Sequence, residues 1–86
     1  MERLKKKDAE AGVTEQPLTD AQRTAIAEAR NVYESRVAER RILHQSAIAG
    51  VFEPAEREER EAEFRRDLER FATDRDAKIR KIRSGE

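Results

Sequence analysis

The stretch that decides the fold is Ile48-Ala49-Gly50-Val51-Phe52-Glu53-Pro54-Ala55-Glu56. It contains the only Gly and the only Pro between residues 19 and 83. Gly50 suits the left-handed position that ends many helices. Pro54 suits the first turn of a new helix, where its missing amide hydrogen is not needed. The three residues between them leave room only for a tight reversal, so this stretch predicts an antiparallel two-helix hairpin.

The first helix of this hairpin is expected over residues 19–49. Thr19 can accept a hydrogen bond from the backbone of Gln22 while the Gln22 side chain reaches back, which is the capping-box pattern. Asp20 suits the positive end of the helix dipole. Pro17, just before, marks the boundary. After the turn at residues 50–53, a second helix is expected over residues 54–83.

Apolar residues recur on one side of each expected helix, as in a coiled coil. Leu43 lies at the edge of the first stripe. Folding the chain about Phe52 places Val37 opposite Leu68, so that apolar positions meet apolar positions. The expected core and self-association residues are Ile26, Tyr33, Val37, Leu43, Ile48, Phe64, Leu68, Phe71, Ile79 and Ile82.

Two polar residues interrupt the first apolar stripe. Arg40 lies in its middle and His44 follows one turn later. A buried arginine needs a partner, and folding about Phe52 places Glu61 opposite both residues. Arg40, His44 and Glu61 are therefore expected to form a polar layer that fixes the register of the helices. A pH-sensing or ligand-binding role for His44 is the weaker interpretation, because no second metal ligand lies nearby.

The overall charge restricts the class of partner. Nineteen basic and nineteen acidic residues give a net charge of zero, although 44% of the chain is charged. This balance argues against a global attraction to nucleic acid or to an anionic membrane. No apolar run approaches the roughly 20 residues that cross a bilayer. A cytoplasmic protein with no membrane association is expected.

Catalytic chemistry lacks its usual residues. The chain has no cysteine, and its serines at 35, 46 and 84 have only His44 as a base. No Gly-rich phosphate-binding loop occurs, and no group of acids is distinguished from the many others. The sequence therefore predicts no enzyme, no catalytic residue, no metal site and no cofactor.

The hairpin is expected to be too thin to stand alone. Only sixteen of the 86 residues are Leu, Ile, Val or Phe, which is little to offset the ordering of two long helices. Ile42 and Ala38 point away from the core stripe. A homodimer is therefore predicted, in which two hairpins form a four-helix bundle.

Charge also predicts how two copies would be oriented. Residues 53–63 carry a net charge of −4, and residues 75–83 carry +4. Matching of the helix dipole accounts for part of this pattern. The same pattern favours an antiparallel pair of hairpins, in which the acidic end of one copy lies beside the basic end of the other and the contact weakens with salt.

The favoured function is a small helical interaction module that self-associates and serves another protein, whose identity is open, as adaptor, assembly factor or regulator. Phe52 either folds back over Ile48 and Ala55 or projects as an anchor, and folding back is the more common arrangement. Candidate docking residues for the partner are Ala38, Ile42, Phe52, Glu53 and Glu56.

Two alternatives remain open. A nucleic-acid-binding hairpin dimer would grip phosphates with bases at one end, but no aromatic residue lies among those bases to stack on a nucleobase. The other alternative is an accessory subunit that is ordered only within a larger complex.

Residues 1–18 are expected to be a flexible polar arm and residues 84–86 a tail. The candidate phosphate contacts are Lys5, Lys6, Lys7, Lys78, Arg80, Lys81 and Arg83.

Overall fold

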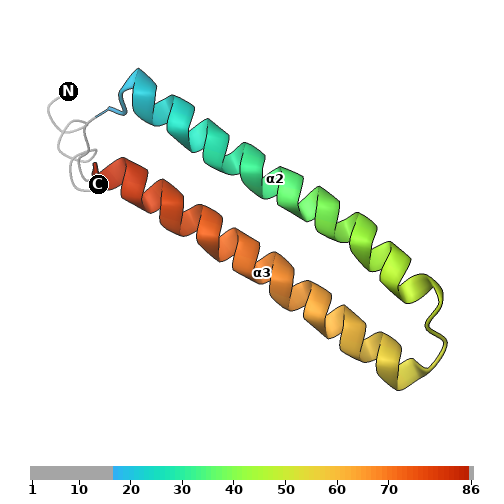
Figure 1. Ribbon diagram of the computed structural model, residues 1–86. Helices are drawn as coiled ribbons and strands as arrows, with labels where there is room; N and C mark the ends of the chain where they lie inside the picture. Colours follow the sequence, from blue (N-terminus) through green and yellow to red (C-terminus); the bar gives the residue numbers. More distant parts are fainter. Residues whose placement is uncertain (1–16, 86) are drawn as a thin grey trace, which may run out of the picture.

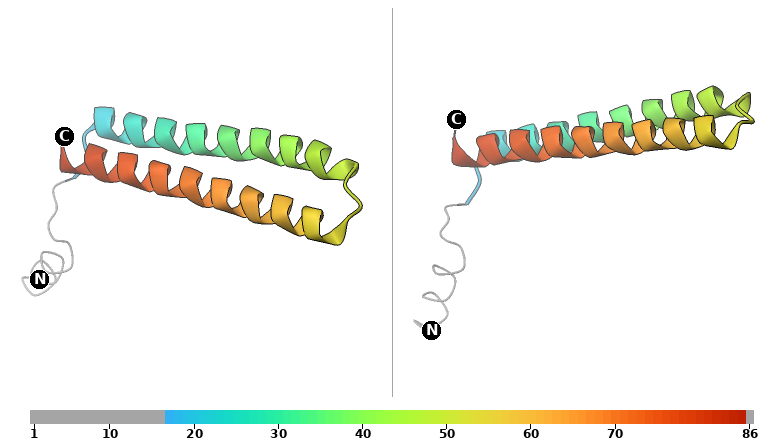
Figure 2. Two further views of the ribbon diagram at one scale, coloured as in Figure 1. Left: turned by 60° about the horizontal axis from the view of Figure 1, so that its bottom comes forward. Right: turned by 90° about the horizontal axis from the view of Figure 1, so that it is seen from below.

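The structure of the protein is a computed structural model that describes residues 17–85. It consists of two helices, α2 over Asp20–Ala49 and α3 over Pro54–Ser84, joined by a short turn. Figure 1 shows the helices lying side by side in opposite directions, and Figure 2 shows the same pairing from two further sides. No strand occurs within residues 17–85. The predicted all-α hairpin is thus confirmed, with α3 continuing one residue beyond the expected 54–83.

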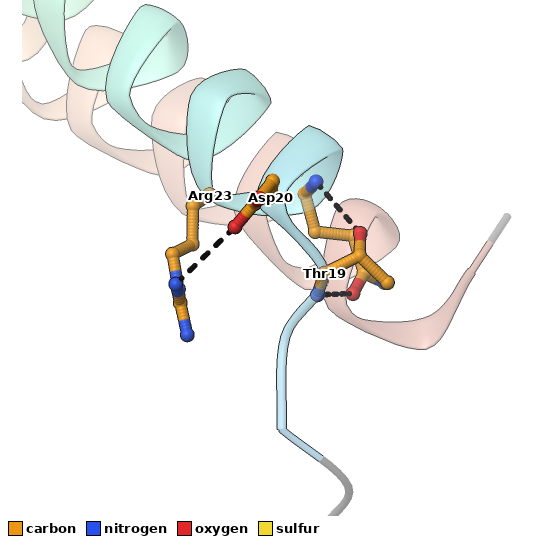
Figure 3. A network of polar contacts seen from close by, with 4 residues as sticks. Thr19, Asp20 and Arg23 are labelled. Carbon is orange, nitrogen blue, oxygen red and sulfur yellow. Dashed lines mark hydrogen bonds and ion pairs between the residues drawn. The ribbon is translucent and has the colours of Figure 1, made fainter.

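The capping box at the start of α2 is also confirmed (Figure 3). The Gln22 backbone N–H donates to Thr19 Oγ1 at 3.0 Å, and the Thr19 N–H donates to Gln22 Oε1 at 2.9 Å. Asp20 pairs with Arg23 at 3.5 Å across the first turn. Two of the backbone N–H groups at this helix start are satisfied by side chains, which explains why α2 begins where it does.

The end of α2 differs from the prediction. Gly50 has φ −104° and ψ 14°, so it is not in the left-handed conformation. Near the end of α2, the Ile48 carbonyl accepts from the Val51 backbone N–H at 3.1 Å and from the Arg57 guanidinium at 3.2 Å. Arg57 also donates to the carbonyl of Val51 in the turn at 3.1 Å. The left-handed glycine is instead Gly85 at the end of α3, with φ 81°. The Arg57 side chain of α3 thus satisfies a carbonyl near the end of α2, which a left-handed cap residue does in many other helices.

The buried core is small. Within residues 17–85, Ile26, Ala29 and Val51 are the only buried hydrophobic residues. Leu43 is 62% exposed, so it lies outside the core of the hairpin, because its place at the edge of the stripe turns it away from α3. Its predicted part in self-association stays a prediction. The other expected core residues are half-buried: Tyr33, Val37, Ile48, Phe64, Leu68, Phe71, Ile79 and Ile82.

Candidate interaction surface

The polar layer between the helices contains a partner that the sequence pattern does not predict. The Arg40 Nε donates to an Asp67 carboxylate oxygen at 2.8 Å, and the Arg40 guanidinium lies 5.5 Å from the centre of the Phe64 ring. His44 stacks on the same Phe64 ring, with ring centres 4.2 Å apart and planes at 7°. Arg40 and His44 therefore do lie together, but Glu61 is not the residue that Arg40 binds.

The direction of helical side chains explains why the expected Arg40–Glu61 pair does not form. Side chains tilt toward the N-terminus of their own helix. In an antiparallel hairpin that direction runs toward the C-terminus of the other helix, so the long Arg40 side chain reaches further along α3 than folding about Phe52 suggests. It meets Asp67, six residues beyond Glu61.

The ion pair changes the acidity of Asp67. The hydrogen bond from Arg40 is the main cause that lowers the pKa of this carboxyl, and the charges of Arg40, Arg70 and Arg66 act in the same direction. Partial burial opposes them. Arg70 lies 3.4 Å from the other carboxylate oxygen. Asp67 is thus held as an anion between arginines of both helices.

Arginines also cover the other aromatic rings of the interface. The Arg75 guanidinium lies 4.3 Å from the centre of the Tyr33 ring, and Arg36 lies 5.7 Å from that of Phe71. Arg75 also donates to Asp76 at 2.9 Å, a bond that raises the pKa of Arg75 and lowers that of Asp76. These contacts add cation–π attraction to the packing between the two helices.

At the turn, Val51 and not Phe52 covers the end of the hairpin. Val51 is buried, whereas Phe52 is 85% exposed. The folded-back arrangement favoured for Phe52 is therefore wrong, because Val51 continues the inward stripe of α2 and takes that place. Glu53 and Glu56 are exposed beside Phe52. The turn thus presents an aromatic ring among acidic side chains.

A second exposed apolar region lies on α2. Ile42 is 64% exposed, Leu43 62% and Val32 48%, and Ala38 is exposed as well. Val32 borders a shallow groove of about 420 Å³ whose other walls include Tyr33, Arg36, Phe71 and Lys78. The sequence places Ile42 and Ala38 on the outer side of the hairpin and Val32 off the centre of the apolar stripe, but it does not predict the exposure of Leu43 or the groove.

The opposite end of the hairpin is basic. Lys78, Arg80, Lys81 and Arg83 are all exposed, and none of them forms an ion pair within residues 17–85. Gln22 Nε2 donates to the Ile82 carbonyl at 3.0 Å, which ties the start of α2 to this end of α3. Lys5, Lys6 and Lys7 lie outside the described residues.

Neither helix of residues 17–85 has both the length and the apolar composition needed to cross a membrane.

Comparison with known proteins gives no relative from which a function could be inferred. No protein-family model, no curated protein and no solved structure matches this chain. Within residues 17–85 there is also no cluster of three His, Cys, Asp or Glu residues that could hold a metal ion. The surfaces described above are therefore what a functional proposal rests on.

Proposed function

We propose that this protein is a small, non-enzymatic helical interaction module, and that it associates with a second copy of itself and with another protein. In this role it acts as an adaptor, an assembly factor or a regulator. The observation that carries the proposal is the imbalance between buried and exposed apolar residues. Three hydrophobic residues are buried within residues 17–85, whereas four large ones, Val32, Ile42, Leu43 and Phe52, are exposed.

The physical argument concerns what a two-helix hairpin can bury. Fully burying a Val, Leu, Ile or Phe side chain contributes roughly 1.5–3 kcal/mol, and most of those in this hairpin are only half-buried. Ordering each residue costs roughly 1.5 kcal/mol. A second apolar surface placed on α2 would cover Val32, Ile42 or Leu43 and add burial without ordering more backbone in each chain.

A homodimer that forms a four-helix bundle is the simplest arrangement that supplies this surface. The two ends of the hairpin favour it, because residues 53–63 carry a net charge of −4 and residues 75–83 a net charge of +4. Two copies that pack antiparallel set opposite charges side by side at both ends. Phe52, which is 85% exposed at the turn, is then the residue expected to bind another protein.

Sedimentation equilibrium over a series of protein and salt concentrations tests the proposal, with helicity followed by circular dichroism. The expected result is a strongly helical dimer whose dissociation constant rises with ionic strength, because exposed charges are screened over about 10 Å at 0.1 M salt. A monomer at every concentration would overturn self-association. An association that is indifferent to salt would overturn the charge-matched arrangement.

A second candidate function is the binding of nucleic acid through the basic end. The supporting observation is that Lys78, Arg80, Lys81 and Arg83 are exposed and make no ion pair within residues 17–85. A gel-shift titration with duplex and single-stranded probes distinguishes this candidate from the first. Binding that disappears when these four residues are changed to Ala would support it, and the absence of any shift at low salt would rule it out.

A further inference from the structure

One flank of α2 carries a regular repeat that lies mostly outside the contact with α3. Eight positions alternate in steps of four and three residues, the spacing by which a helix presents a continuous seam to a partner. The first member, Ala25, is half-buried, and Ala29 is buried against α3; the other six are exposed. The seam positions are Ala25, Ala29, Val32, Arg36, Glu39, Leu43, Ser46 and Gly50.

This seam is complementary to itself when it is read in the reverse direction. Two antiparallel copies can be aligned so that the numbers of any two facing residues add up to 75. In this alignment, Val32 of one copy meets Leu43 of the other, and Arg36 of one copy meets Glu39 of the other. Ala25 then lies level with Gly50 and Ala29 with Ser46, so only small residues stand at both ends of the seam. In a two-fold dimer every such contact occurs twice, once from each copy. The middle of the seam thus holds two ion pairs, flanked on each side by an apolar layer.

We propose that two copies of this chain associate through this seam, with their α2 helices antiparallel and Arg36 of each copy paired with Glu39 of the other. The inference rests on the self-association proposed above and specifies its surface. Neither Arg36 nor Glu39 forms an ion pair within residues 17–85. The Arg36 guanidinium lies 5.7 Å from the centre of the Phe71 ring, so its charge has an aromatic neighbour in the hairpin but no carboxylate. Val32 and Leu43 are also the large apolar residues that this flank leaves exposed.

The same register brings the charged ends together. In the same alignment, Glu53 of one copy lies level with Gln22 of the other. The Gln22 side chain donates to the carbonyl of Ile82, which belongs to the basic end of α3. The acidic first turns of one α3 therefore lie at the level of the basic last turns of the other. The long-range charge pattern and the local seam thus select one orientation, although they involve different residues.

The same residues make a parallel pairing of this seam unfavourable. It sets Arg36 against Arg36 and Glu39 against Glu39, and it places acidic ends beside acidic ends. Like charges that face each other across an interface weaken association and exclude the wrong arrangement. The occupant that fits the seam is accordingly a second, antiparallel copy.

Charge reversal tests the pairing. Arg36→Glu alone sets a new carboxylate against Glu39 of the other copy, and Glu39→Arg alone sets a new guanidinium against Arg36. Each variant should therefore lose at least about tenfold in self-association by sedimentation equilibrium. An equimolar mixture of the two variants restores opposite charges in both pairs and should form a heterodimer. This rescue also controls for folding, because Arg36 covers Phe71 within the hairpin. Variants that still dimerise like the wild type, or a mixture that does not associate, would overturn the pairing.

Disulfide trapping gives a second test, since the chain has no cysteine of its own. Val32→Cys mixed with Leu43→Cys should form a disulfide-linked heterodimer on oxidation, because facing seam residues lie within disulfide reach. Val32→Cys alone should not, because its two copies lie about 16 Å apart along the helix axis. If the wild type dimerises but two copies of the Val32→Cys variant form a disulfide with each other, the antiparallel seam would be refuted and self-association would stand. A wild-type chain that remains a monomer would refute the proposed function itself.

Discussion

At the scale of single residues, arginine carries much of the contact between α2 and α3. Arg40 binds Asp67 and covers Phe64, Arg75 covers Tyr33, and Arg57 donates to the Ile48 carbonyl near the end of α2. Each of these guanidinium groups contacts either an aromatic ring or hydrogen-bond acceptors at the interface or the turn. Substitution of such an arginine therefore removes packing and a hydrogen bond together.

The Asp67 pair predicts how stability depends on pH. The pKa of Asp67 in the hairpin is below its ordinary value of 3.8, mainly because Arg40 donates a hydrogen bond to it. The stability that this carboxylate contributes is therefore complete above pH 3.8 and is lost as the pH falls through the lower folded value. Urea unfolding should show Asp67→Asn less stable than the wild type at neutral pH, with a gap that closes in acid.

Asp74→Asn is the matched control for that measurement. It removes the same kind of acid from the same helix, but Asp74 forms no ion pair within residues 17–85. If both variants gave a gap of the same size and the same pH profile, the loss would be a general effect of net charge. The Arg40–Asp67 pair would then have no specific part in stability.

The two glycines predict opposite responses to the same substitution. Gly50 has negative φ and open space where a Cβ would lie, so Gly50→Ala should stabilise the hairpin by about 0.4–1 kcal/mol through the unfolded chain. Gly85 has φ 81°, which costs an L-residue roughly 1 kcal/mol, so Gly85→Ala should give no gain or a small loss. Thermal unfolding of both variants checks this, and a stabilising Gly85→Ala would contradict the left-handed conformation.

At the scale of the elements, the start of α2 depends on one hydroxyl group. Thr19→Ala removes the acceptor of the Gln22 amide and should destabilise the hairpin by about 1 kcal/mol. Thr24→Ala is the control, because Thr24 is exposed within α2, where Ala is the better helix former. Chemical denaturation should therefore show changes of opposite sign. Equal changes would mean that the capping box contributes nothing.

The elements also show which features of a sequence can be predicted without a structure. The capping residues Thr19 and Gln22 and the helix-starting Pro54 act on backbone groups within a few residues, so their pattern determines the helix bounds locally. The burial of Val51 in place of Phe52 follows from the inward stripe of α2. The choice of Asp67 over Glu61, in contrast, depends on how side chains tilt across the hairpin. Wheel positions and chain reversal alone do not contain that information, so the helices are predictable and the contacts of Arg40 are not.

At the scale of the whole molecule, stability and association are expected to be coupled. A dimer that binds only folded chains raises the unfolding midpoint as the protein concentration increases. The wild-type hairpin should show this rise in a thermal scan, and Leu43→Glu, which places a charge in the exposed apolar region of α2, should reduce or abolish it. A midpoint independent of concentration in the wild type would indicate a hairpin that is stable alone.

Because Gln22 is bonded to Ile82, segments attached before Pro17 and after Gly85 leave the hairpin at one end, while Phe52 lies at the other. Thirty helical residues at 1.5 Å each hold these points about 45 Å apart. The hairpin therefore separates its turn from both attached segments by the length of its helices. A protein fused to either end of the hairpin would therefore hold Phe52 about 45 Å from the point of fusion.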